Sequence, residues 1–441
     1  MKSTKQLFLK ALGFDEKRHS IRTELLAGLT TFLTMSYILA VNPLILGETG
    51  MDKGAVFSAT VIAAAAATIV MAFYAKMPFA LASGMGLNAF FAYTLVIAMG
   101  YTWQEAIAAV LLEGIIFILL TIFKVREAIV NAIPLNLRYA ISAGIGLFIA
   151  YIGLKNGGII VSSEATVTTL GAWNATSLLA MAGVLIGAVL MALKVRGALF
   201  YTIIGMTIIG IPIGVTHIPE GFSLVSLPSS IEPVALKFDF GRFISLDVEY
   251  YIVVFTLLFM DLFDTLGTLI GASTSAGMAD KNGRIHGLNK ALMADAVGTT
   301  VGALVGTSTV TTYVESTTGI AAGGRTGLTS FTVAALFFVA LFFSPLFLVI
   351  PSAATTSALV IVGVLMTQTI MKIDFNDITE AVPSFITIVM MPFTASISEG
   401  IVLGMLSYVL IKVCAGKGKN LSVVMYILAA FFVMKYIAPM L

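Results

Sequence analysis

Two aspartates, Asp261 and Asp264, stand three residues apart in an otherwise apolar stretch, VVFTLLFMDLFDTLGTLIGAS (residues 253–273). Positions three apart share one face of a helix, so both carboxyl groups point the same way. A carboxylate at the bilayer centre costs at least about 2.5–3.5 kcal/mol and ordinarily faces a cavity or a partner. The apolar segments hold almost no Lys or Arg to pair with these acids. The pair therefore predicts a polar site inside the membrane, and Gly267 extends its face as bare backbone against which a flat molecule would fit.

A third acid, Glu315, lies in the Gly-, Ser- and Thr-rich stretch TSTVTTYVESTTGIAAGG (307–324). The β-branched residues before it favour a short extended piece, and those after it start a helix. Glu315 would then stand near a helix N-terminus, where unpaired N–H groups favour negative charge. Extended backbone at membrane depth is tolerated only where it is buried in protein or lines a cavity. We expect Glu315 and its neighbours Val314 and Ser316 to line the site, with capping of its own helix as the alternative.

A similar broken stretch in the first half, PFALASGMGLNAFFAYTLV (78–96), contains Asn88. Gly86, shortly before it, permits close approach of the backbone. An amide both donates and accepts hydrogen bonds, which suits a heterocycle with mixed edges. Phe90 and Phe263 are candidates to cover the face of a flat ring. These residues extend the predicted substrate site.

Carboxyl groups inside a membrane also offer a place to load a proton, because desolvation favours their neutral form. Glu113 and Asp295 are further acids inside apolar runs, and either would pair across helices or relay a proton. The residues considered for proton coupling are Asp261, Asp264, Glu315 and Glu113.

The composition indicates the solvent in which these residues work. Of 441 residues, 59% are hydrophobic and 11% are charged, whereas a soluble domain has about 25% charged residues. No soluble fold has enough interior for so many apolar side chains, so we predict an all-α polytopic membrane protein. The net charge of +2 and the lone Cys414 point to no nucleic-acid partner and no disulfide. The histidines lie far apart and no ATPase-type phosphate loop occurs, so we expect no metal, no cofactor and no enzymatic activity.

Apolar runs suitable for membrane helices, which need roughly 20 residues, recur along the whole chain. They are 24–46, 55–75, 104–123, 138–155, 176–193, 197–215, 249–271, 289–306, 327–349, 353–371, 382–396, 398–415 and 421–440. With each broken stretch counted as one crossing, seven crossings precede residue 217 and seven run from 249 to about 415; the run 421–440 is left without an assigned place. Because Lys and Arg accumulate on the cytoplasmic side, the N-terminus is expected inside. So are the basic loops 124–138, 194–197, 278–290 and 323–327.

Seven is odd, so the second half begins on the opposite side from the first, as in two inverted repeats. The expected parts are a basic leader (1–23), a first repeat (24–216), an extracytoplasmic loop (217–248) and a second repeat (249–441). Paired interrupted segments at matching positions are the best sequence pointer to a transporter's binding site. Asn88 and Glu315, which are 227 positions apart, would hold matching places.

Four motifs in order carry a resemblance: GLTTFLTMSYILAVNP, FALASGMGLNAFFAY, FMDLFDTLGTLIG and VESTTGIAAGGRTGLT. Together, over about residues 15–440, they resemble the nucleobase/cation symporter-2 family, specifically its AzgA-like branch of hypoxanthine, guanine and adenine permeases. The resemblance implies 14 transmembrane segments in two inverted repeats. It also implies a core domain from segments 1–4 and 8–11, a gate domain from segments 5–7 and 12–14, and a short strand in each of segments 3 and 10. A homodimer is a further family expectation.

The family's binding residues lie on segments 3, 8 and 10, and they map onto Asn88, the pair Asp261 and Asp264, and Glu315. The uracil and xanthine branches use a Glu on segment 8 and an Asn after the segment-10 acid. In this sequence Asp261 and Asp264 are both candidates for the position of that Glu, and both are kept. Ser316 stands at the position of that Asn, which fits the AzgA-like branch.

The expected function is uptake of a purine nucleobase across the inner (cytoplasmic) membrane, coupled to a proton or alternatively to sodium. Glu315 and one aspartate would accept hydrogen bonds from ring N–H groups. Asn88 would bind an edge of the base that carries both donors and acceptors, and a Phe would cover the face of the ring. The order of preference among adenine, guanine and hypoxanthine stays open. The alternative on the same architecture is an anion transporter of the sulfate or bicarbonate type, whose site should lack acids beside helix N-termini. An aspartyl protease is disfavoured, because acids on one helix cannot flank a peptide bond.

Overall fold

The computed structural model describes residues 4–123, 134–163, 166–219, 221–275, 287–394 and 396–437. In this part of the chain, seven helices are long and apolar enough to cross a membrane, and Ile21–Gly47 and Lys53–Ala75 are the first two. Shorter apolar helices such as Ala198–Gly210 accompany them. The chain is therefore a multi-pass helical membrane protein, as its composition predicts. Most of the basic loops 124–138 and 278–290 lies outside the described residues.

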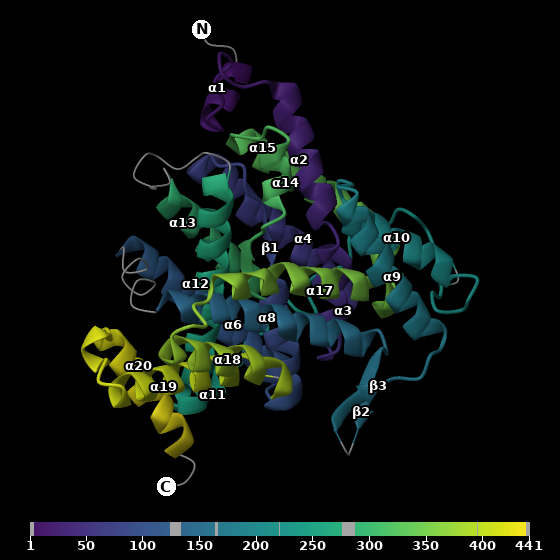
Figure 1. Ribbon diagram of the computed structural model, residues 1–441. Helices are drawn as coiled ribbons and strands as arrows, with labels where there is room; N and C mark the ends of the chain where they lie inside the picture. The colour runs from purple at the N-terminus through teal and green to yellow at the C-terminus, as the bar shows by residue number, and fades with distance from the viewer. Residues whose placement is uncertain are drawn as a thin grey trace.

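The elements follow the predicted runs in order from purple to yellow (Figure 1). Those of the first half are α1 (Thr4–Ala11), α2 (Ile21–Met35), α3 (Ile38–Gly47), α4 (Lys53–Val70), η1 (Met71–Ala75), β1 (Leu81–Ser83), α5 (Met85–Ala89), η2 (Phe90–Ala98), α6 (Trp103–Ile122), α8 (Leu135–Asn156), β2 (Ile160–Ser163), β3 (Val167–Leu170), α9 (Ala175–Ala192) and α10 (Ala198–Gly210). Those of the second half are α11 (Gly241–Ile244), α12 (Val248–Ser275), α13 (Leu288–Val305), β4 (Val310–Thr312), α14 (Ser316–Ala321), α15 (Gly327–Ala340), η3 (Leu341–Phe343), α16 (Ser344–Leu348), α17 (Ser352–Thr367), η4 (Gln368–Lys372), α18 (Ile378–Phe393), α19 (Ile397–Cys414), η5 (Gly418–Asn420) and α20 (Val423–Ile437).

Two short strands, one from each half, meet in the middle of the protein. β1 and β4 pair antiparallel, with Leu81 opposite Thr312 and Ser83 opposite Val310. All of their residues are buried, and the ladder satisfies backbone groups that lipid could not. Each strand leads into a short helix, α5 or α14. The structure confirms that segments 3 and 10 are broken by short strands.

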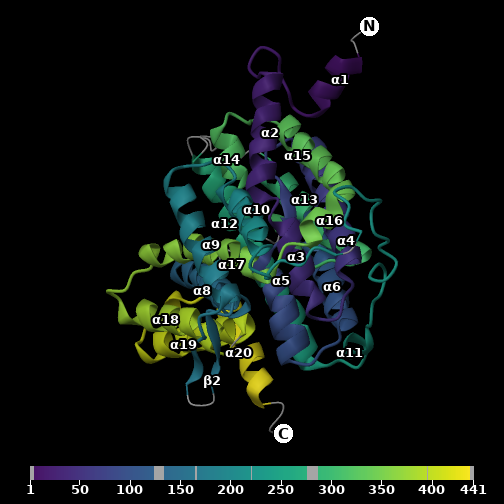
Figure 2. The ribbon, with the colours of Figure 1, turned by 90° about the vertical axis from the view of Figure 1, so that its right-hand side faces the viewer.

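The helices pack in two groups. The strand-bearing group consists of α2, α3, α4, α5, α6, α12, α13, α14 and α15 around the strands, and the flanking group consists of α8, α9, α10, α17, α18 and α19. Both views place α18 and α19 far from α2 and α15 (Figures 1 and 2). Within the flanking group, α8 and α17 are in close contact at glycines: a Cβ on Gly146 would lie 2.6 Å from the Gly363 carbonyl oxygen. Small residues of this kind are the main means by which membrane helices associate.

Both ends of the described chain are packed. Glu24, buried on α2, accepts hydrogen bonds from two backbone N–H groups just before α15. The Leu12 carbonyl accepts one from the Gly327 N–H at the start of α15. At the other end, α20 packs on α19 and α12, and the rings of Phe255 and Phe432 lie 6.0 Å apart. The described parts of the leader (4–23) and of the last apolar run (421–437) thus belong to the folded structure.

Candidate functional site

Glu315 directly precedes α14, and its side chain does not cap that helix. Its Oε1 instead accepts a 2.6 Å hydrogen bond from the hydroxyl of Tyr37. Tyr37 lies at the break between α2 and α3 and is buried, whereas Glu315 is partly exposed. The ring of Tyr37 lies 6.5 Å from that of Tyr313. The hydroxyl of Tyr313 in turn donates a 2.6 Å hydrogen bond to the Ser83 carbonyl. Strand pairing and this tyrosine pair together hold Glu315 beside the ladder.

Asp264 lies beside β4. The hydroxyl of Thr311, the middle residue of that strand, lies 3.4 Å from Asp264 Oδ2. Asp264 is partly exposed and lies within electrostatic range of Glu315. Two partly exposed acidic residues thus lie next to β4.

Asp261 is fully buried, in contrast to Asp264. Its Oδ1 lies 3.2 Å from the Thr265 hydroxyl, which is also 2.7 Å from Asp295 Oδ1 and 2.8 Å from the Thr311 hydroxyl. Asp295 is likewise fully buried. The two aspartates predicted to act as a pair therefore differ in environment: Asp264 is partly exposed, whereas Asp261 belongs to a buried cluster that contacts the same Thr311 hydroxyl.

Asn88 and Glu113 are held by the residues just before β4. The Ser308 hydroxyl donates to Asn88 Oδ1, and the Thr309 hydroxyl donates to Glu113 Oε2 at 2.6 Å. Asn88 is fully buried, and among the described residues its Nδ2 has no hydrogen-bond partner. Because the carbonyl end is occupied, the amide has donors left for a ligand.

The remaining predicted residues take varied places. Gly86 packs against α8, where a Cβ would lie 2.7 Å from Ile145 Cγ2. Phe90 is fully buried, whereas Val314 is 48% exposed and extends the accessible surface beside Glu315. The Ser316 hydroxyl accepts the Ala80 N–H at 3.0 Å, so it fixes the start of β1. The side chain of Phe263 and the surroundings of Gly267 lie outside the described part of the structure.

One expectation about the site is wrong. Gly84 precedes α5 as Glu315 precedes α14, whereas Asn88 is the fourth residue of α5. The strands begin at Leu81 and Val310, 310 − 81 = 229 positions apart, so the offset of 227 does not relate matching places. Connections of different length between the elements of the two halves prevent one offset from aligning them.

Three contacts were not anticipated: those of Tyr37, Thr265 and Thr311. The sequence signal for them was a set of hydroxyl-bearing residues within apolar segments, since buried polar groups need partners.

No group of three His, Cys, Asp or Glu side chains that would hold a metal occurs in the described ranges. The site offers two carboxyl acceptors, an amide donor and a tyrosine hydroxyl, which suit a flat polar molecule rich in N–H groups.

Comparison with known proteins agrees with this picture. Residues 22–403 match the xanthine/uracil permease model, described as Permease family. The adenine permease AdeQ of Escherichia coli is 44% identical over 419 residues, covering 95% of this chain and 93% of that protein. The guanine/hypoxanthine permease PbuO of Bacillus subtilis is 43% identical over 425 residues, covering 95% and 97%.

Solved structures confirm the fold. The transmembrane domain of the cyanobacterial bicarbonate transporter BicA has a TM-score of 0.62 and 18% identity, with 87% of this chain and 96% of that chain covered. The murine anion transporter Slc26a9 in its inward-facing state has a TM-score of 0.63 and 12% identity, with 94% and 73% covered. At these identities the likeness concerns the fold alone.

Proposed function

The chain belongs to the permease family matched over residues 22–403, the nucleobase/cation symporter-2 family, and on this basis we propose that it takes up purine nucleobases. It is a membrane transporter and not an enzyme. Relatives that share 43–44% of its sequence over nearly its whole length are named as adenine and guanine/hypoxanthine permeases. The substrates proposed are adenine, guanine and hypoxanthine. The membrane proposed is the inner (cytoplasmic) one, with the N-terminus inside.

One observation carries the proposal: two partly exposed carboxyl groups, Asp264 and Glu315, flank a strand pair built from both halves. A purine presents ring N–H groups on one side and ring nitrogens or an exocyclic oxygen on another. Glu315 and Asp264 would accept the N–H groups, and Asn88 Nδ2 would donate to an acceptor on the base. Hydrogen bonds to charged acceptors are the strong ones, so the carboxyl groups would contribute most of the affinity.

Proton symport is the coupling we propose. A neutral base brings no charge to balance the carboxyl groups, and a carboxylate without a cation is costly in the membrane interior. A proton taken up with the base would remove that cost during the crossing. Asp264 and Glu315 are the carriers in accessible space, whereas Asp261 and Glu113 would pass the proton inside the protein.

Alternating access would follow from motion between the two helical groups. The strand-bearing group corresponds to the expected core domain (segments 1–4 and 8–11), and the flanking group to the gate domain (segments 5–7 and 12–14). The site residues Glu315, Asp264 and Asn88 all lie in the strand-bearing group, so rocking against the gate would expose them to each side in turn. Assembly as a homodimer is part of the proposal.

Anion transport on the same fold is the competing function. BicA and Slc26a9 share the fold, but their likeness carries no information on substrate at this identity. Two carboxyl groups facing the site would repel sulfate or bicarbonate. The purine proposal is therefore favoured by the charge of the site itself.

Uptake of radiolabelled adenine, hypoxanthine, guanine, xanthine and uracil in a nucleobase-transport-deficient host tests the proposal. Wild type is compared with Glu315→Gln and with Glu232→Gln, which alters an exposed acid outside the site. Saturable purine uptake that is lost in Glu315→Gln and kept in Glu232→Gln supports it. Loss on adding a protonophore supports proton coupling, and dependence on sodium instead would overturn that part. A correctly inserted protein that takes up no nucleobase would overturn the proposal and favour anions.

A further inference from the structure

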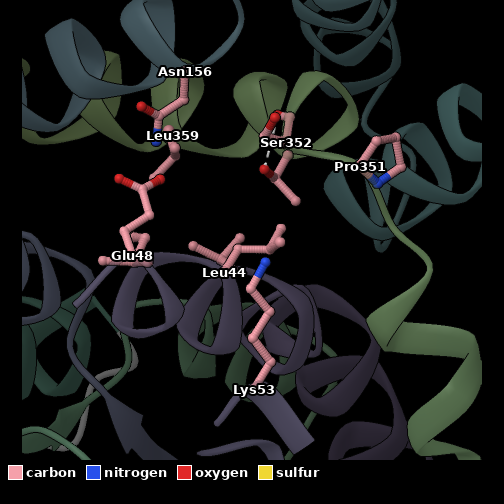
Figure 3. A pocket seen from close by; sticks show the side chains of 10 residues that line it. Leu44, Glu48, Lys53, Asn156, Pro351, Ser352 and Leu359 are labelled. Carbon is pink, nitrogen blue, oxygen red and sulfur yellow. Dashed lines mark hydrogen bonds between the residues drawn. The ribbon is translucent and has the colours of Figure 1, made fainter. Parts of the chain in front are cut away.

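A cavity of about 320 Å³ lies between the two helical groups, outside the site described above. One wall comes from the strand-bearing side and includes Leu44 of α3, Glu48 and Lys53. The opposite wall comes from the flanking side and includes Asn156 at the end of α8 and Leu359 of α17. Figure 3 shows the Glu48 carboxyl group directed across the space toward Asn156.

The helix α3 connects this cavity to the candidate site. Val41 lines the cavity, and Tyr37, four residues earlier, stands about one helical turn away. Tyr37 is the residue that donates to Glu315. A molecule held in the cavity would therefore lie beside the substrate site, displaced along α3 toward Glu48.

The polar groups of the cavity are linked across the two helical groups. Asn156 Nδ2 donates a 2.7 Å hydrogen bond to the hydroxyl of Tyr93 on η2. Glu48 interacts with the same hydroxyl and with the charges of Lys155 and Lys53. Glu48 follows the span that ends at Gly47, and burial raises the pKa of its carboxyl above the ordinary value. Glu48 and Lys53, which both line the cavity, thus offer a hydrogen-bond acceptor and a donor to a polar ligand.

The dimensions and the apolar lining also fit a flat ring. Cavities that bind small molecules begin at about 300 Å³ and combine mostly apolar walls with a few placed polar groups. Here Leu44 and Leu359 supply apolar surface from opposite walls, and Glu48 and Asn156 supply an acceptor and a mixed amide edge. This repeats, with weaker groups, the pairing of Glu315 and Asn88 in the candidate site.

We propose that this cavity is a second, outer binding site for the transported purine, in which Glu48 and Asn156 select the base before it reaches Glu315. The inference rests on the proposed function, because it assigns the same ligand to a second place. Since its walls belong to both helical groups, the outer site would lose its shape when those groups move. The base would then be released from it during the transport cycle, and its affinity would be lower than that of the inner site.

Equilibrium binding to the purified full-length protein in lipid nanodiscs tests the proposal, with radiolabelled adenine and hypoxanthine as the probes. The variants are Glu48→Gln, which keeps the size of the side chain, Leu44→Phe, which adds a ring to the cavity, and Glu315→Gln, which weakens the inner site. Glu232→Gln, which changes an exposed acid that does not line the cavity, is the control. Size-exclusion profiles and Tm values establish that each variant is folded.

We expect wild type to bind two equivalents, one tight and one weak. Glu315→Gln should remove the tight one only. Glu48→Gln should weaken the other about tenfold or more, as loss of a hydrogen bond to a charged group does, and Leu44→Phe should weaken it by filling the cavity. Uptake KM should rise in the last two variants. A single equivalent in wild type, or Glu48→Gln and Leu44→Phe indistinguishable from the control, would overturn the outer site and leave the proposed function intact. Absence of any purine binding to wild type would overturn both.

Discussion

The hydroxyl of Tyr37 lies 2.6 Å from Oε1 of Glu315, a residue 278 positions further along the chain. This bond joins the break in the first membrane segment to the start of α14 in the second half. It is short, as hydrogen bonds to carboxylates are, and the Glu315 side chain forms no capping hydrogen bond with α14. The carboxyl group of Glu315 thus links the two halves of the chain through a hydrogen bond.

Tyr37→Phe should weaken substrate binding while leaving the fold intact. The ring and its contact with Tyr313 are kept, but Glu315 loses the donor that orients it. A hydrogen bond to a charged group is worth about 1.5–3 kcal/mol, so we expect uptake KM to rise at least tenfold. Tyr426→Phe, which removes an exposed tyrosine bond to the Gly418 carbonyl, is the matched control. An unchanged KM would show that Glu315 is oriented by other contacts.

The two aspartates of α12 should respond differently to conversion to asparagine. Asp264 is partly exposed, so Asp264→Asn should abolish purine binding with little change in Tm. Asp261 is buried and bonded to Thr265, so Asp261→Asn should lower stability by about 1–3 kcal/mol through mismatched buried groups. Binding assays and thermal unfolding on both variants separate the effects. The reverse pattern would assign the substrate contact to Asp261.

The broken stretches were predictable because their local chemistry differs from that of ordinary spans. β-branched residues before Glu315 and small residues before Asn88 favoured extended backbone, and β4 and β1 form there. The helix after Glu315 likewise starts where a terminus was expected. These features depend on neighbours within a few positions, which is the range over which propensities act.

The partners of the acids were not predictable, because they come from distant segments. Spacing places Asp261 and Asp264 on one face, but their burial differs according to what packs against each turn of α12. Thr265 and Asp295 surround the first, and Thr311 borders the second. Periodicity along one helix contains no information about such contacts between helices.

Close packing of α8 on α17 predicts that Gly146→Ala is destabilising. Its new methyl group would lie 2.6 Å from the Gly363 carbonyl oxygen, so the helices must separate. Overpacking of this kind costs about 1–3 kcal/mol. Gly205→Ala on α10 is the control, because nothing lies within 4 Å of its added Cβ and alanine is the better helix former. Tm should fall for the first variant and hold or rise for the second.

Asp377 predicts a pH dependence confined to acid conditions. Its hydrogen bond from Lys417, 2.9 Å long, holds the pKa of this carboxyl well below its usual range. A carboxyl whose folded pKa is depressed stabilises the fold above its unfolded pKa of about 3.9 and loses that contribution as pH falls toward the folded value. Asp377→Asn should therefore flatten the Tm profile only below about pH 4. If the slope of Tm against pH differed between wild type and Asp377→Asn from pH 5 to pH 8, this prediction would be contradicted.

The buried lysine of α19 should be more important for stability than any exposed ion pair. Lys412, whose side chain is 8% exposed, lies 2.6 Å from Glu380 Oε1 and donates to the Thr379 hydroxyl. Glu380 also accepts from Asn136 of α8 and from Tyr408 of α19, so the cluster joins three helices of the flanking group.

Removing only the cation leaves Glu380 as an uncompensated, largely buried charge, which costs about 3–5 kcal/mol. Lys412→Met should therefore lower the Tm of the purified protein by several degrees. Lys412→Met combined with Glu380→Gln removes both charges and should recover a large part of the loss, since neutral replacement of a buried pair is often tolerated. Thermal unfolding of the single and double variants measures this coupling. If the double variant is as unstable as the sum of its single changes, the pair is not coupled and the lysine stabilises the flanking group through packing of its stem instead.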